Sequence, residues 1–261
     1  MSYKMKLLTF NTHSLVAGEG ERQVSVLAEA ILKEKFDVIA LQEVNQKIGD
    51  KESNFAFRVV SRMKEMGEDY AWTYLPIKIG YGIYDEGLAF LSRAPLAEIR
   101  SGYLSKTHSY DNWKTRMALG IRPEGSEAWF WNLHMSWWED PDEPFCAQWV
   151  RLLSLLSPKE EVWLMGDFNN PAEIRGEGYD LVRESGFYDA YELAEKRQGA
   201  GTASAGIDGW HGRSVAAESL RIDQIWSSRP RKISFCHTIF DGERYDVISD
   251  HFGVAIGIEN R

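Results

Sequence analysis

The chain has 261 residues, a formal net charge of −9, and hydrophobic and charged fractions of 44% and 26%. These fractions are typical of a globular enzyme, and no linker, repeat or low-complexity tract divides the sequence. We therefore expect one domain over residues 1–261. The negative charge provides no general attraction to nucleic acid or to an anionic membrane surface, which counts against both as partners.

The sequence also lacks the marks of export or membrane insertion. No apolar run approaches the length that spans a membrane, and no signal-peptide core follows Lys4 and Lys6. The two cysteines, Cys146 and Cys236, lie far apart, which favours reduced thiols over a disulfide framework. We expect a cytoplasmic protein with no membrane contact.

The first elements are a predicted strand, helix and strand. Residues 5–10 form an apolar run that ends at Asn11, and residues 22–35 carry apolar side chains at helical spacing. A second buried strand is predicted over residues 37–41, with Glu43 just beyond it. An exposed acid at a strand end is the ordinary interpretation of Glu43. However, two successive predicted strands each end near a side chain that can bind a metal, and this repetition favours a functional role for Glu43.

The middle of the chain continues the alternation of strands and helices. Helices are predicted over 55–66 and 143–156, and strands over 72–79, 87–92, 97–103, 115–121 and 128–133. His134 follows the last of these strands, and Trp138 comes soon after it. A single histidine is more often a structural hydrogen-bonding residue than a catalyst, but this one again follows a strand.

The stretch from residue 161 to 170 organises the predicted site. Residues 162–165 are apolar, as expected for a strand buried on both faces, and Asp167 and Asn169 follow. In extended backbone, side chains two positions apart share one face, so this carboxylate and amide can address a single ligand. The alternative is a strand that runs into an Asx-rich turn.

The last third begins with less regular sequence. Short helices are predicted over 179–184 and 190–196, a long Gly/Ala/Ser-rich loop over 200–218, and strands over 220–226, 233–240 and 252–258. Asp223 lies among apolar neighbours and needs a buried partner. Asp250 and His251 immediately precede the final strand.

Together these positions supply carboxylates, amides and histidines near strand ends. Hard oxygen ligands are those that Mg²⁺ selects, and histidines beside carboxylates suit acid–base chemistry or stabilisation of phosphoryl charge. The sequence has no His/Cys cluster typical of zinc, no nucleophile elbow and no P-loop.

These motifs resemble the endonuclease/exonuclease/phosphatase superfamily of DNase I-like proteins over essentially the whole chain. They are, in order, TFNTH, LQEV, GLAFLSR, NLHMSWW, GDFNN, RIDQIW and SDHFG. The resemblance implies an α/β fold, a four-layer αββα sandwich in which two mixed β-sheets lie face to face between helices. It implies a metal-dependent phosphoric ester hydrolase with its site at one edge of the sandwich.

The resemblance also assigns roles. It implies ligands for Mg²⁺ or Mn²⁺, direct or through water, at Asn11, Glu43 and Asp250. It implies five catalytic residues around the phosphoryl group, namely His134, Asp167, Asn169, Asp223 and His251. Within that set, Asp167 and Asn169 position and deprotonate the attacking water. His134 contacts a phosphate oxygen, and Asp223 orients His251, which faces the phosphoryl group.

A narrower resemblance is to maltose 6′-phosphate phosphatases, through NTHS, HMSWWED, GDFNNPAE, IDGWHG and FDG. It implies a sugar phosphate as substrate. The candidate substrate-binding residues are Lys114, Arg116, Trp138 and Trp210, as phosphate clamp and sugar-stacking surfaces. The alternatives are a nuclease of the same fold, a non-catalytic binding module and a secreted phospholipid-cleaving enzyme. Nuclease members often carry an Asp where this chain has His13, which weakens the nuclease alternative.

Overall fold

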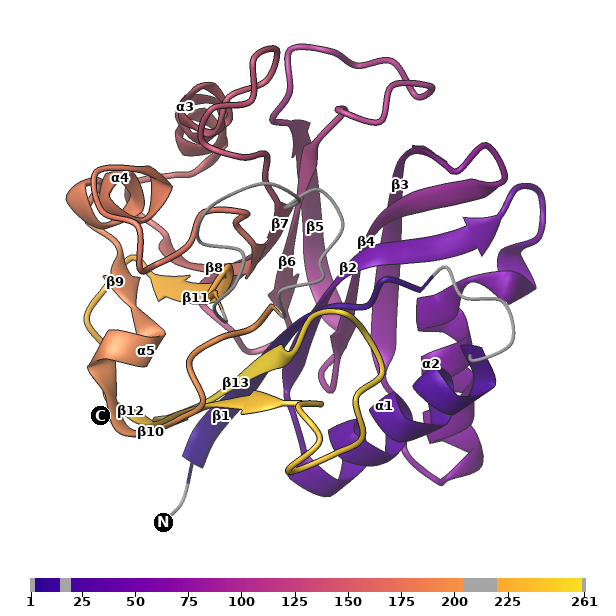
Figure 1. The fold of residues 1–261 in the computed structure, drawn as a ribbon. Helices are drawn as coiled ribbons and strands as arrows, with labels where there is room; N and C mark the ends of the chain where they lie inside the picture. The colour runs from indigo at the N-terminus through magenta and orange to yellow at the C-terminus, as the bar shows by residue number, and fades with distance from the viewer. Residues whose placement is uncertain (1–2, 15–19, 204–219, 260–261) are drawn as a thin grey trace.

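Two β-sheets pack face to face in the computed structural model, which describes residues 3–14, 20–203 and 220–259 (Figure 1). The first sheet has the strand order β10 (Ala194–Gln198), β12 (Ile233–Ile239), β13 (Gly253–Glu259), β1 (Tyr3–Asn11), β2 (Val38–Lys47), β4 (Tyr84–Ser92) and β3 (Ala71–Gly80). The second has the order β5 (Leu96–Tyr103), β6 (Met117–Pro123), β7 (Ala128–His134), β8 (Glu161–Asp167), β11 (Asp223–Ser227) and β9 (Tyr188–Asp189).

Helices cover the outer faces of both sheets. The helices α1 (Gly20–Glu34) and α2 (Phe55–Glu65) pack on the first sheet, and α3 (Phe145–Leu155) and α4 (Gly178–Glu184) on the second (Figure 1). Two short helices, η1 (Lys51–Ser53) and α5 (Ala190–Leu193), lie in connections. The predicted four-layer αββα sandwich is confirmed.

Alternating side chains of the central strands build three large cores, one between the sheets and one under the helices of each sheet. In β1, Leu7 packs between the sheets, while Leu8 packs under the helices of the first sheet. Phe90 of β4 meets Phe130 and Trp163 of the second sheet in the same inner layer. Because successive strand residues point to opposite faces, strands buried on both faces must read as continuous apolar runs.

Several predicted boundaries need correction. The helix predicted over residues 190–196 is only α5, and the chain then forms the edge strand β10. Pro144 lies outside α3 as its N-cap residue. The strand predicted to end at Leu41 continues as β2 to Lys47. Most of the loop predicted over 200–218 lies outside the described residues.

Two further observations bear on the expected environment. Within the described ranges, no helix combines the length and the apolar character needed to cross a membrane. Cys146 and Cys236 are both free thiols, the first exposed and the second buried.

Candidate active site

Three neighbouring strands of the second sheet align a histidine and two carboxylates. His134 at the end of β7 is the register partner of Asp167 at the end of β8, and Asp167 pairs in turn with Asp223 at the start of β11. The parallel pairing of β7 and β8 places both carboxyl ends at one edge of the sheet. His134 and Asp223 are 33 and 56 positions away from Asp167 in the sequence, and strand pairing alone brings them next to it.

Glu43 reaches the site from a bulge within a strand. The pairing of β2 with β4 shifts register between Leu41 and Val44, and Glu43 has a φ of 50°. The sequence placed Glu43 beyond a strand end, so its position is a correction. His13 and Asn169 also have positive φ, at 38° and 50°. Such strained non-glycine residues persist where the surrounding structure holds them, and they cluster at functional sites.

Asp167 is buried and carries several directed contacts. Its Oδ1 accepts a hydrogen bond of 2.8 Å from the Asn169 backbone N–H, and its Oδ2 accepts one of 3.1 Å from Asn11 Nδ2. His134 Nε2 lies 3.7 Å from the same Oδ2. Burial, and then the charge of Asp223, raise the pKa of Asp167 to about 7. A carboxyl with this pKa can exchange a proton near neutral pH.

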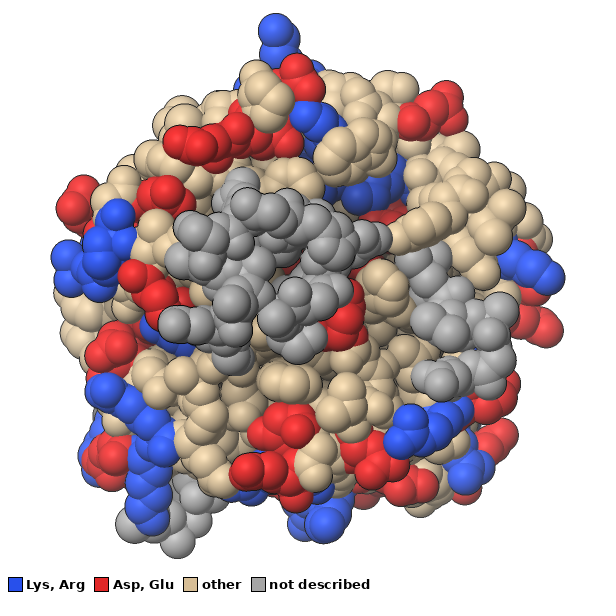
Figure 2. All heavy atoms as spheres, viewed as in Figure 1, with Lys and Arg blue, Asp and Glu red and all other residues tan. Residues whose placement is uncertain are grey.

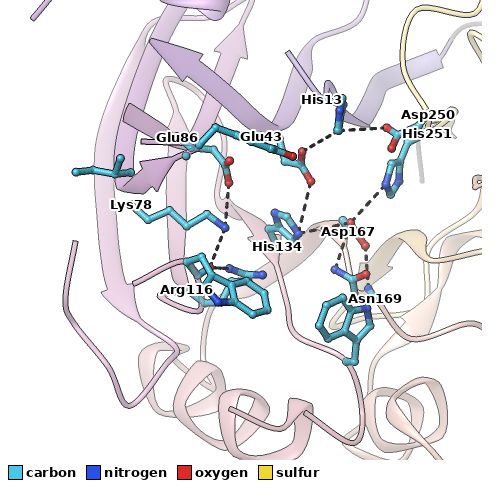
Figure 3. Close-up of a pocket in the computed structure, with 15 residues that line it drawn as sticks. His13, Glu43, Lys78, Glu86, Arg116, His134, Asp167, Asn169, Asp250 and His251 are labelled. Carbon is cyan, nitrogen blue, oxygen red and sulfur yellow. Dashed lines mark hydrogen bonds and ion pairs between the residues drawn. The ribbon is translucent and has the colours of Figure 1, made fainter. Parts of the chain in front are cut away.

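His251 and Asp223 form a buried hydrogen-bonded pair. His251 Nδ1 lies 2.9 Å from Asp223 Oδ2, and its Nε2 lies 3.9 Å from Asp167 Oδ2. Burial acts to lower the pKa of His251, but the charge and hydrogen bond of Asp223 outweigh it and raise that pKa to about 10. His251 is therefore an imidazolium at neutral pH, with Nε2 directed toward the cavity (Figure 3).

A second group of charges lies on the first-sheet side of the site. His13 Nδ1 lies 3.3 Å from Glu43 Oε2 and 3.6 Å from Asp250 Oδ1 (Figure 3). Burial acts to raise the pKa of Glu43, but the hydrogen bonds with His13 and Asn11 outweigh it and hold that pKa well below its usual range. Glu43 is therefore ionised and available as an oxygen ligand.

Asn11 joins the two groups. Its Nδ2 donates to Glu43 Oε1 at 3.0 Å and to Asp167 Oδ2 at 3.1 Å, while its Oδ1 accepts from the His13 backbone N–H at 3.2 Å. In this amide orientation Asn11 holds the two carboxylates at a fixed spacing.

Burial, and then the charge of Arg116, lower the pKa of His134 well below its usual range, so that side chain is neutral.

Among the described residues, one group of acids and histidines brings its ligand atoms close enough together for a single ion. Asp167, Asp223 and His251 offer ligand atoms within 4.8 Å of one another. The hydrogen bond between His251 Nδ1 and Asp223 is by itself enough to bring these two side chains together, so their closeness does not require a metal ion. Glu43 and Asp250 are not part of that group, and His13 Nδ1 lies between their carboxylates; carboxylate oxygens of this kind suit a hard cation.

All of these side chains except Asp223 line a cavity of about 460 Å³. Its floor carries the acids and histidines, and its walls carry Tyr81, Trp113 and Trp137. The Trp113 and Trp137 rings lie 6.3 Å apart at an angle of 57°. The volume falls within the range of small-molecule sites in proteins.

Two cations contribute to the cavity wall, and their partners differ. Lys78 Nζ lies 3.0 Å from Glu86 Oε1 and donates to the Trp113 carbonyl at 3.0 Å. Arg116 Nη1 donates to the carbonyls of Trp113 and Thr115 at 2.8 and 3.2 Å, and its buried Nε has no hydrogen-bond partner. Among the described residues no carboxylate oxygen lies within 4.0 Å of the Arg116 guanidinium, although only 8% of the residue is exposed.

Of the predicted substrate-binding residues, only Arg116 lines this cavity in the described part of the chain. Lys114 Nζ instead contacts Asp140 and Asp142, at 3.1 and 2.5 Å. Trp138 packs on Phe145 with ring centroids 6.4 Å apart. These contacts do not support the predicted clamp and stacking roles, which stay predictions. Trp210 lies outside the described residues.

Sequence analysis missed the Lys78–Glu86 pair. The two residues are register partners across β3 and β4, and both are buried. Lys78 stands between Ile77 and Ile79, a pattern that equally fits an ordinary strand with one solvated face. The signal is therefore not in the local sequence, because it depends on the pairing of two strands.

The fold and this site define a hydrolase of phosphoric esters. The sequence profile described as the Endonuclease/Exonuclease/phosphatase family matches residues 8–251, so the chain belongs to that family. Its members hydrolyse phosphoric esters and typically depend on a divalent metal. No protein among curated sequences matches the chain.

Several solved structures share the fold of this chain. An endonuclease/exonuclease/phosphatase family protein from Leptotrichia buccalis is 28% identical, with a TM-score of 0.87 over 98% of this chain and 100% of that one. A mannosyl-6-phosphatase from Bacteroides thetaiotaomicron is 20% identical, with a TM-score of 0.70 over 98% and 100%. A truncated Caenorhabditis elegans TDP2 is 18% identical, with a TM-score of 0.63 over 98% and 97%. The last two likenesses concern the fold alone.

Proposed function

We propose that the protein is a divalent-metal-dependent phosphomonoesterase that hydrolyses a sugar phosphate. The observation that carries this proposal is the buried Arg116 guanidinium at the cavity wall, whose hydrogen bonds within the described residues go to neutral carbonyls. A buried charge without a partner is costly, so a site of this kind favours an anionic ligand. A guanidinium matches the geometry of phosphate oxygens through several parallel donors.

The aromatic walls support a sugar as the remainder of the substrate. Trp113 and Trp137 meet at an angle above the acidic floor, and Trp113 is 52% exposed. The apolar faces of a pyranose ring pack well on such side chains.

The polar groups have distinct roles in this proposal. Asp167 accepts a proton from the attacking water. The hydrogen bond of 2.8 Å from the Asn169 backbone N–H fixes the rotamer of Asp167. His251, held charged by Asp223 at 2.9 Å, stabilises the negative charge that grows on phosphoryl oxygens. Neutral His134 donates a hydrogen bond to a phosphate oxygen.

Glu43 and Asp250 are the residues that would hold the metal ion, and Asn11 fixes Glu43 through its 3.0 Å hydrogen bond. This donor set fits a divalent cation because the Glu43 carboxyl stays ionised. When bound, such an ion neutralises charge on the phosphate and stabilises the leaving oxygen. We propose Mg²⁺ or Mn²⁺ for this role and a cytoplasmic location for the protein.

A nuclease of the same fold is the competing proposal, and the family description covers both activities. One assay separates them: phosphate release from a panel of hexose and disaccharide phosphates, beside nicking of plasmid DNA, with Mg²⁺ and with Mn²⁺. We expect release from at least one sugar phosphate, no nicking, and a loss of about 10²-fold or more in kcat for Asp167→Asn. DNA cleavage at physiological salt with no phosphate release from any sugar would refute the proposal.

A further inference from the structure

The Asp223–His251 pair joins the two sheets, and no strand pairing holds it together. Asp223 begins β11 in the second sheet, whereas His251 lies just before β13 of the first sheet. Strand β11 is hydrogen-bonded to β8 and β9, and β13 is hydrogen-bonded to β12 and β1. The 2.9 Å contact between His251 Nδ1 and Asp223 Oδ2 therefore depends on another segment that fixes one backbone to the other.

Thr202 provides this connection. It is fully buried, and its Oγ1 accepts hydrogen bonds from the backbone N–H groups of Ile222 and Asp223 at 3.1 and 3.0 Å. Its own carbonyl accepts a hydrogen bond of 2.6 Å from the N–H of Phe252, the residue after His251. One residue between β10 and β11 thus ties the start of β11 to the segment that carries the histidine.

The next residue, Ala203, extends the connection. It forms isolated antiparallel bridges with Leu220 and with His251 itself. It also joins a small apolar cluster with Leu220 and Ile222, against which Trp137 of the cavity wall packs. The segment around Thr202 therefore contacts both the His251 backbone and an aromatic side chain of the cavity.

The Thr202 hydroxyl uses its full hydrogen-bonding capacity. A hydroxyl has two acceptor positions and one donor. Both acceptor positions receive N–H groups, and the hydroxyl donates to the Leu220 carbonyl at 3.4 Å. Valine has the same shape without an acceptor, so it would leave both N–H groups buried and unpaired unless the start of β11 moved.

Such a movement would be felt by the Asp223 carboxylate. Its buried Oδ1 has no hydrogen-bond partner among the described residues, and its Oδ2 bonds to His251. The position of this carboxylate therefore depends strongly on where the Asp223 backbone is held.

We propose that Thr202 is a positioning residue of the active site: its hydroxyl holds Asp223 at hydrogen-bonding distance from His251 and so keeps the histidine directed at the phosphoryl group. The inference rests on the role of this pair in the proposed function, and it adds a buried residue that is not part of the cavity wall. The alternative is a threonine that only stabilises the fold. A positioning residue acts through Asp223, whereas a merely structural one does not.

Steady-state kinetics of the full-length protein with p-nitrophenyl phosphate and a saturating divalent metal test the proposal. We expect kcat to be highest in Thr202→Ser, lower in Thr202→Cys and lowest in Thr202→Val, because sulfur is a weak acceptor and a methyl group is none. Thr202→Val should lose about 10²-fold in kcat with KM nearly unchanged, which is the cost of a displacement of about 1 Å. If valine prevents folding, the serine and cysteine variants still make the comparison.

Thr238 on β12 is the matched control. Its buried Oγ1 donates to Asp241 Oδ2 at 2.8 Å, away from the pair. Thr238→Val should leave kcat unchanged, and urea unfolding of both valine variants reports their cost in stability. A loss of kcat in both variants in proportion to their loss of stability would overturn the inference.

The Asp223→Ala background shows whether Thr202 acts through the pair. Because the carboxylate is absent there, we expect Thr202→Val to lower kcat by less than about twofold further. The full loss in that background, or a Thr202→Ser variant as impaired as Thr202→Val, would also overturn the inference.

Proton NMR provides a readout that needs no turnover. The hydrogen bond to Asp223 shifts the Nδ1 proton of His251 downfield, and the resonance is identified by its absence in His251→Ala. We expect this resonance to persist in Thr202→Ser and Thr238→Val, and to move upfield or disappear in Thr202→Val. An unchanged resonance in Thr202→Val would refute the positioning role. The expected NMR changes without phosphate release from any sugar phosphate would instead refute the proposed function alone.

Discussion

At the scale of single residues, the Asp223–His251 pair sets the charge opposite the phosphate. Asp223 acts through His251, since the 2.9 Å contact keeps the imidazolium charged and oriented. We expect Asp223→Asn and His251→Ala each to lower kcat, the latter by about 10²-fold or more. The double variant should be hardly worse than His251→Ala, because both changes remove one function. Additive losses in kcat would show that Asp223 acts on another group.

The position of Trp113 at the cavity wall leads to a prediction about sugar binding. It is 52% exposed at the cavity wall, whereas Trp138 packs on Phe145, so Trp138 is a matched control for loss of an indole. We expect Trp113→Ala to reduce kcat/KM for a disaccharide phosphate about tenfold more than for an aryl phosphate, on the scale of one aromatic contact. Trp138→Ala should affect both substrates equally. Equal losses in Trp113→Ala would remove its role as a sugar contact.

His237 on β12 links pH to stability away from the site. Burial, and then the charge of Arg244, lower the pKa of His237 to about 4. A histidine with a lowered pKa stabilises the fold above its unfolded pKa of about 6.5 and loses that contribution as pH falls toward 4. We expect His237 to account for a loss of about 2 kcal/mol in the free energy of unfolding between pH 7 and pH 5. Urea unfolding of His237→Gln at both pH values should show a loss smaller by that amount.

At the scale of elements, strand ends were predictable where an apolar run meets a polar side chain. Asn11, His134 and Asp167 all stand at the ends of predicted strands, and the pairing of β7 with β8 brings two of them together. The local sequence does not reveal features that depend on pairing. The bulge at Glu43 needs the β4 partner, and the Lys78–Glu86 contact needs β3 and β4 in register.

Two side chains with predicted substrate-binding roles have contacts that the local sequence did not indicate. Lys114 carries the positive charge that a phosphate clamp needs, but Asp140 and Asp142 from a distant loop form ion pairs with that charge. Trp138 follows His134 closely in sequence, yet its ring turns toward α3 to pack on Phe145. Proximity in sequence to a catalytic residue does not fix the direction of a side chain in a loop, because non-local packing decides it.

Gly166 controls the spacing of β7 and β8 just before Asp167. A Cβ there would stand 2.0 Å from the Leu133 carbonyl oxygen, in a residue with a φ of 154°. Gly125 in the β6–β7 turn has a φ of 75° and open space, which makes it a control for backbone strain alone. We expect Gly125→Ala to cost about 1 kcal/mol and Gly166→Ala at least about 3 kcal/mol in urea unfolding, with loss of activity only in the latter. Equal costs would mean that β7 and β8 separate readily.

At the scale of the whole molecule, the distribution of charge bears on the class of substrate. The net charge is −9, and on the face in Figure 2 the Lys and Arg side chains of the described residues alternate with Asp and Glu. The cations of the cavity wall, Lys78 and Arg116, are only 9% and 8% exposed. Attraction for a phosphate is therefore local, and a long polyanion would meet repulsion beyond the cavity.

Salt dependence tests this difference. A protein that binds DNA through about six phosphate contacts loses about 10³-fold in affinity between 50 and 200 mM salt. For a sugar phosphate whose charge is met inside the cavity, we expect kcat/KM to change by less than about tenfold over this range, since few counterions are released. Initial rates at both salt concentrations, with metal held constant, provide the measurement, and fluorescence anisotropy with a labelled duplex provides the comparison. Tight duplex binding at 50 mM salt that collapses by 200 mM would contradict the sugar phosphate proposal and place a polynucleotide track on this surface.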